Sequence, residues 1–137
     1  MASAAKSLPI KPLMVVLRLD LPSIESGVPI STLTDFVESS GIPLKDLYDI
    51  VIPARTLKHR RERREALTRD ESDKLARVVR VFDHAAKVFE NTEGARLWLS
   101  RPKDRFQGRT PLEMLPTEIG GRAVENFLGQ IEYGMFA

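Results

Sequence analysis

Apolar residues recur at helical spacing along most of this chain. Leu33, Phe36 and Val37 share one helical face, and Gly41 follows where a glycine suits the end of a helix. A second set of apolar positions at the same spacing follows Pro43, which suits a first helical turn. This set comprises Leu44, Leu47, Tyr48 and Val51. The pattern therefore predicts two helices before residue 52.

A longer helix is predicted from Thr68 to about Phe89. Thr68 and Glu71 have the spacing of a capping box, in which each side chain accepts a backbone N–H of the other residue. One apolar stripe then follows the predicted helix: Leu75, Val78, Val79, Phe82, Ala86 and Phe89. This segment is the strongest helical signal in the chain.

Two more helices are predicted in the last third of the chain. A short one contains Leu97–Leu99, follows Gly94 and ends before Pro102; we expect its Trp98 to be a core residue. Thr110–Glu113 forms a second capping box with proline at the first helical position. The last helix is predicted over about 118–131, with these residues facing inward: Val124, Phe127, Leu128 and Ile131.

The N-terminal region has a different pattern. Residues 1–12 read as a loose arm, and the alternation over 13–21 favours a short strand. A lone strand cannot satisfy its own backbone, so it would need a partner from another chain. The alternative is an extended segment docked on the helices. The predicted fold is mainly α, in two packed halves that meet near Thr68.

Composition narrows the class of protein. The chain has 137 residues, 42% of them hydrophobic and 29% charged, and no cysteine. Disulfides and thiolate metal sites are therefore excluded. The longest apolar run, 13–17, is too short to cross a bilayer, and the first residues lack the features of a signal peptide. We expect a soluble, cytoplasmic protein.

Positive charge is concentrated in one window. Residues 55–64 hold six lysines and arginines and one carboxylate, whereas the whole chain has a formal charge of only +2. A compact basic feature on a mildly acidic body is typical of proteins that bind nucleic acids. A solvated helix face or a sorting-type basic cluster is the alternative.

The position of the basic window favours DNA. It follows the three-residue turn Ile52–Ala54, so the two flanking helices would form a helix-turn-helix. At 100° per residue, Leu57 is the only apolar residue able to hold the basic helix against its neighbour. The predicted DNA-facing residues are Arg55, Thr56, Lys58, His59 and Arg63.

The other charged residues of the window have two interpretations. Arg60, Arg61 and Arg64 could pair with carboxylates such as Asp70, Glu71 or Asp73, or could contact phosphates; the sequence leaves both open. Glu62 could accept a hydrogen bond from a cytosine amino group, but its spacing favours an exposed ion pair with Lys58.

Catalytic and metal-binding motifs are missing from the sequence. His59 and His84 are far apart and have no third ligand at metal spacing. There is no glycine-rich phosphate loop and no nucleophile elbow. We therefore expect neither an enzyme nor a bound cofactor or metal.

Several strings resemble the Xre/MbcA/ParS family of antitoxins. The C-terminal strings are similar to the toxin-binding domain of that family, and one upstream string looks like the recognition helix of its DNA-binding half. They are 71–79, 95–99, 108–115 and 120–136, with 55–61 upstream. Two departures are Pro53, where the family has a capping serine, and Gln107–Gly108, where it has two glycines.

The resemblance implies a function. It implies a homodimer that neutralises a RES-domain toxin, an enzyme that depletes NAD, and that represses its own operon by binding operator DNA. The implied division is an arm (1–28), a helix-turn-helix domain (29–67) and a toxin-binding domain (68–137). The C-terminal tail would reach the NAD pocket of the toxin through Glu132, Tyr133, Gly134, Met135, Phe136 and Ala137.

Two rival functions remain open. One is a stand-alone dimeric transcription regulator without a toxin partner. The other is a toxin inhibitor whose basic helix no longer binds DNA. For the tail, the alternative is that Tyr133 and Phe136 fold back onto their own core.

Overall fold

The computed structural model describes residues 11–134, and these residues are helical throughout, without a strand. The α-helices are α1 (Leu13–Val16), α2 (Leu21–Ser26), α3 (Ile30–Ser40), α4 (Ala54–Arg63), α5 (Arg69–Phe89), α6 (Thr92–Leu99) and α7 (Glu118–Glu132). Three short 3-10 turns lie between them: η2 (Leu44–Leu47), η3 (Asp104–Phe106) and η4 (Leu112–Met114). The predicted mainly α fold is confirmed.

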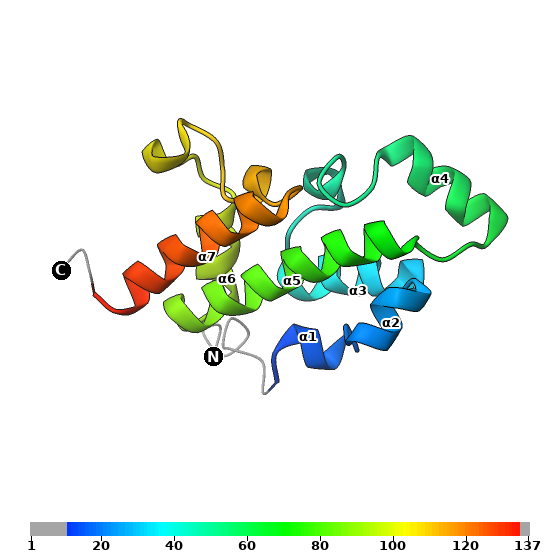
Figure 1. The fold of residues 1–137 in the computed structure, drawn as a ribbon, viewed down its shortest axis with the longest axis horizontal. Helices are drawn as coiled ribbons and strands as arrows, with labels where there is room; N and C mark the ends of the chain where they lie inside the picture. Colours follow the sequence, from blue (N-terminus) through cyan, green and yellow to red (C-terminus); the bar gives the residue numbers. More distant parts are fainter. Residues whose placement is uncertain (1–10, 135–137) are drawn as a thin grey trace.

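Helix α5 is the centre of the molecule. It begins with the predicted capping box: Thr68 Oγ1 accepts the Glu71 N–H, and the Glu71 carboxylate accepts the Thr68 N–H. It contacts α1, α2 and α3 as well as α6 and α7 (Figure 1). Its apolar stripe is buried except for Phe89, which is half-buried. Phe82, for example, meets Phe36 of α3 edge to face at 5.6 Å between ring centroids. Both halves of the chain therefore share one hydrophobic core built on α5.

The strand predicted over 13–21 is wrong. Leu13–Val16 forms helix α1, and the Asp83 carboxylate of α5 accepts both the Leu13 N–H (2.8 Å) and the Met14 N–H (2.9 Å). Burial raises the pKa of Asp83, although these two hydrogen bonds lower it in part. An isolated segment satisfies its backbone better as a capped helix than as a strand without a partner. The cap comes from 70 positions away, so the local pattern could not show it. Residues 1–10 of the predicted arm lie outside the described residues.

The helix predicted over 44–51 is also wrong. Only η2 (Leu44–Leu47) forms there, and Asp49 has a positive φ of 67°. Ile50, Val51 and Ile52 are buried one after another. The left-handed conformation of Asp49 interrupts the helical turn just before these residues. The predicted three-residue turn between two full helices is therefore replaced by residues 41–53, which connect α3 to α4.

The remaining helices match the predictions more closely. α3 ends at Gly41, which has a φ of 77° and donates its N–H to Val37. α6 begins earlier than expected because the Asn91 side chain caps it by accepting the Gly94 N–H. Thr110 and Glu113 do exchange the two capping-box hydrogen bonds, but they open only the 3-10 turn η4.

The aromatic residues of the C-terminal half form a chain at the edge of the core. Trp98 lies between Phe89 and Phe127, with ring centroids 5.7 Å and 5.5 Å away. Lys103 Nζ lies 4.9 Å from the Trp98 ring, and burial lowers the pKa of this lysine. Trp98 was predicted to be a core residue, but it is half-buried at the edge of the core, where its contact with Phe127 joins α6 to α7.

Candidate nucleic-acid and toxin interfaces

The basic window forms helix α4, which is held to the rest of the protein at two points. Leu57 is 2% exposed and is the one buried residue of this helix, as expected. Arg60 forms an ion pair with Glu71 of α5 and also reaches the Ala66 carbonyl. One apolar contact and one ion pair thus leave the other faces of α4 open to solvent.

The five predicted DNA-facing residues lie on or beside one open face of α4. Arg55, Lys58, His59 and Arg63 are exposed, and Thr56 at the edge is half-buried. None of their side chains has an ion-pair partner among residues 11–134. The structure therefore brings together four exposed side chains, three of them lysine or arginine, on one open face of α4.

No side chain caps the start of α4 in the described part of the chain. Pro53 precedes Ala54, and no side chain accepts a hydrogen bond from the first turn. The first N–H groups of a helix have no partner within the helix and carry partial positive charge. They are available to an anion such as a phosphate.

The structure distinguishes Arg60 from Arg61 and Arg64, for which the sequence left two interpretations open. For Arg60, the carboxylate interpretation is correct, with Glu71 as its partner. Arg61 and Arg64 have no ion pair in the described part of the chain and line a shallow pocket beside Ile30. The expected Lys58–Glu62 ion pair is absent from the same residues.

The end of α7 is attached to α5 by charged side chains. Glu132 Oε1 lies 3.2 Å from His84 Nε2, and Glu132 Oε2 lies 3.7 Å from Lys87 Nζ. Tyr133, the next residue, is 83% exposed, so it does not fold back onto the core. Gly134 has a φ of 70°, which turns the chain away from the helix. Met135, Phe136 and Ala137 of the predicted toxin-binding tail lie outside the described residues.

The start of α7 depends on a buried arginine that sequence reasoning missed. Arg77 of α5 is 7% exposed and donates hydrogen bonds to the Leu115 and Pro116 carbonyls, at 3.0 Å and 3.3 Å. It passes so close to Gly121 that a Cβ there would lie 2.9 Å from Arg77 Cδ. The paired glycines of α7 were the available signal, because they permit such close packing.

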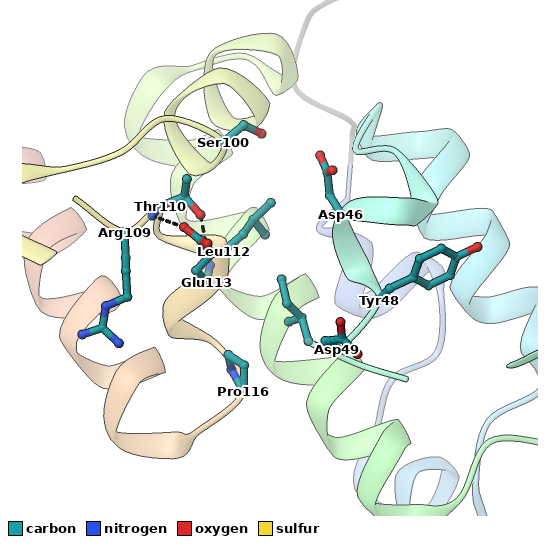
Figure 2. A pocket seen from close by; sticks show the side chains of 10 residues that line it. Asp46, Tyr48, Asp49, Ser100, Arg109, Thr110, Leu112, Glu113 and Pro116 are labelled. Atoms are coloured by element: carbon teal, nitrogen blue, oxygen red, sulfur yellow. Dashed lines mark hydrogen bonds between the residues drawn. The ribbon is translucent and has the colours of Figure 1, made fainter. Parts of the chain in front are cut away.

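A cleft of about 590 Å³ lies between the segment before α4 and the segment before α7. Figure 2 shows Asp46, Tyr48 and Asp49 on one wall and Ser100, Thr110 and Glu113 on the other. The contact between Thr110 and Glu113 is the capping pair described above. No histidine, lysine or cysteine lines the cleft.

Residues 11–134 contain neither a metal-binding cluster nor a membrane-spanning helix. No group of three or more His, Asp or Glu side chains there could hold a metal ion. None of the helices in this range is long and apolar enough to cross a membrane. His84 is engaged by Glu132 instead.

Two protein-family models match the segments that contain these two surfaces. The sequence model of the antitoxin Xre-like helix-turn-helix domain matches residues 21–80. The model of the antitoxin Xre/MbcA/ParS C-terminal toxin-binding domain matches residues 84–134. α4 lies in the first match, and the exposed end of α7 lies in the second.

Relatives similar over most of the chain carry the same description. Antitoxin Xre of Pseudomonas putida KT2440 is 41% identical over 125 residues, which cover 85% of this chain and 79% of the relative. Antitoxin Xre of Yersinia enterocolitica is 32% identical, covering 84% and 79%. Antitoxin Xre of Photorhabdus laumondii is 33% identical, covering 82% and 77%. The chain therefore belongs to the Xre family of antitoxins, with a helix-turn-helix domain followed by a toxin-binding domain.

Proposed function

We propose that this protein neutralises a RES-domain, NAD-depleting toxin and represses its own operon as a homodimer in the cytoplasm. The family assignment supports an antitoxin that binds DNA. The RES toxin follows from the resemblance of the C-terminal strings. The predicted division at 28/29 and 67/68 is part of the proposal.

One observation carries the proposal: the two candidate surfaces are both exposed and lie far apart. Figure 1 places α4 and the end of α7 at opposite ends of the long axis of the molecule. Arg55, Lys58, His59 and Arg63 are accessible at one end, and Tyr133 is 83% exposed at the other. The two candidate surfaces therefore do not overlap on one protomer.

The DNA side follows from the charge and shape of α4. Residues near the start of a recognition helix reach base edges, whereas later cations bind phosphates. Arg55, Thr56 and the uncapped first turn would approach the bases and an adjacent phosphate, and Arg63 would bind the backbone. In a homodimer, two such helices would read half-sites one or more helical turns apart, about 34 Å each.

The toxin side follows from the exposed tail. Tyr133 is a large amphipathic side chain at the end of a helix that is fixed by Glu132, and such aromatic anchors dominate binding energies at interfaces. The tail 132–137 would enter or cover the NAD pocket of the toxin. Blocking the pocket sterically requires no chemistry from the antitoxin.

The deciding experiment measures NAD in a purified mixture. A purified RES-domain toxin is incubated with NAD, with and without a stoichiometric amount of the antitoxin. We expect NAD consumption to fall with the antitoxin:toxin ratio until it stops. NAD consumption that is unchanged at saturating antitoxin would show that the proposed function is wrong.

A further inference from the structure

One face of α7 is open to solvent from the beginning of the helix to its end. At 100° per residue, Ile119, Arg122, Asn126, Gly129 and Tyr133 fall within an arc of about 80°. Ile119 and Tyr133, at the two ends, are each 83% exposed and are the most exposed large hydrophobic residues among 11–134. The side chains of this stripe form no hydrogen bond or ion pair with the described residues. We call these five residues the α7 stripe.

Among residues 11–134, no contact gives a packing reason for the glycine in the stripe. A Cβ on Gly120 would lie 1.8 Å from the Met114 carbonyl oxygen, and a Cβ on Gly121 would lie 2.9 Å from Arg77, so both positions require glycine. A Cβ on Gly129 would meet nothing within 4 Å. Glycine is the poorest helix former after proline, so it weakens the last turn of α7 without any gain in packing against the described residues. A partner molecule that packs closely against the α7 backbone at Gly129 would explain why this position is a glycine.

We propose that the α7 stripe is a docking surface for the toxin, with Gly129 as its point of closest approach. This inference rests on the proposed function. The toxin is the occupant because the stripe lies within the residues that match the toxin-binding domain. It is also continuous with Tyr133, where the proposed tail begins. The helix body and the tail would thus form a single interface.

The stripe specifies the chemistry of its partner. Ile119 and Tyr133 are fourteen positions apart, about 21 Å at 1.5 Å per residue. The toxin surface should therefore carry two apolar recesses at that separation. It should also carry a carboxylate opposite Arg122 and a tightly packed segment against Gly129, since only a position without a side chain admits a backbone so closely.

The central test separates stability from binding by replacing Gly129. Gly129→Ala and Gly129→Gln both improve helix propensity, so each variant should melt a few degrees higher than the wild type. Both should bind the purified RES-domain protein more weakly in calorimetry, by about threefold for alanine and at least tenfold for glutamine. Ser39→Ala, on the exposed face of α3, is the control: it improves helix propensity elsewhere and should leave the toxin Kd unchanged. A more stable variant with weaker binding cannot be explained by misfolding.

A second pair of variants tests the apolar end of the stripe. Ile119→Asp should weaken toxin binding at least tenfold, whereas Val16→Asp on α1, another exposed apolar residue, should not. If wild-type protein binds the toxin and both Gly129→Gln and Ile119→Asp bind it equally well, the inference is overturned and the proposed function stands. If wild-type protein does not bind the toxin, both are overturned. Unchanged toxin affinity with a loss of homodimer mass in sedimentation would assign the stripe to a second copy, which also overturns the inference.

Discussion

Arg60 of α4 and Glu71 of α5 form an ion pair through the same carboxylate oxygen that accepts the Thr68 N–H in the capping box. Both side chains are largely buried, with 19% of Arg60 and 14% of Glu71 exposed. Burial raises the pKa of Glu71, but the hydrogen bonds from Arg60 and Thr68 outweigh it and hold the pKa below its usual value. One carboxylate therefore both starts the central helix and holds the basic helix in place.

Replacing Glu71 by glutamine should destabilise the protein in a pH-dependent way. The folded pKa is lower than the unfolded value of 4.5, so the stabilisation is complete above that pH and is lost as the pH falls through the folded pKa. At pH 7, Glu71→Gln should cost about 1–2 kcal/mol in the free energy of unfolding. Urea titrations from pH 7 to pH 3 should show the two proteins converging in acid.

The matched control for this prediction is Asp70→Asn, an exposed carboxylate in the same helical turn. It loses only an interaction with the helix dipole and should cost about 0.5 kcal/mol. An equal effect of the two substitutions would show that the Arg60–Glu71 contact contributes nothing specific.

Alanine substitution of Arg55 and Arg63 should distinguish base contacts from phosphate contacts. Arg55→Ala is expected to cost about 1–3 kcal/mol at a single operator position and to relax specificity there. Arg63→Ala should instead weaken binding to all sequences and lower the salt slope by about one. Fluorescence anisotropy at several salt concentrations measures both, with the exposed Arg101→Ala as control. Unchanged operator binding by both α4 variants would favour the toxin inhibitor that does not bind DNA.

Deleting residues 133–137 should release the toxin and leave operator binding intact. The two surfaces lie at opposite ends of the molecule, and Tyr133 contributes little to the core because it is 83% exposed. NAD consumption by the toxin and operator affinity should be measured on the same preparation. If the shortened protein still stops NAD consumption, blocking is due to the helix body rather than the tail.

Adding a Cβ to the paired glycines of α7 should destabilise the protein in a graded manner. Gly121→Ala would press on the flexible Arg77 side chain and should cost about 1 kcal/mol, whereas Gly120→Ala would collide with the Met114 carbonyl and should cost about 3 kcal/mol. Thermal unfolding with circular dichroism gives the order. Equal stabilities for the two variants would contradict the packing described here.

Removing the Asp83 carboxylate should release α1 without unfolding the protein. Asp83→Ala loses both hydrogen bonds to the backbone of Leu13 and Met14 and should cost about 1 kcal/mol, as for the loss of a helix cap. Hydrogen exchange at Leu17, whose N–H is bonded to the Leu13 carbonyl, should accelerate, while exchange in α5 should change little. The control is Asp70→Ala, which removes another exposed carboxylate of α5. Asp73 is unsuitable as a control because it forms an ion pair with Arg77.

Local chemistry alone predicted much of this protein. Four of the predicted features depend on residues within a few positions of each other. They are the capping box at Thr68, the apolar stripe of α5, the glycine at the end of α3 and the single apolar anchor Leu57. Helix caps and helical periodicity are local by nature, because the hydrogen bonds and contacts that produce them join near neighbours. The basic face of α4 was predictable for the same reason.

Tertiary structure decided the features that join distant positions. The alternation over 13–21 favoured a strand, but Asp83 caps the segment as a helix from 70 positions away. The spacing over 44–51 favoured a helix, but the chain takes a left-handed turn at Asp49 and enters the core through Ile50, Val51 and Ile52 instead. Likewise, the sequence presented Arg60, Arg61 and Arg64 as equivalent, and only the folding of α4 against α5 brought Arg60 to Glu71. The sequence by itself determined which segments are helical wherever the cause is local. The fold determined which charges are neutralised and which remain exposed, because pairing depends on distances that only packing sets.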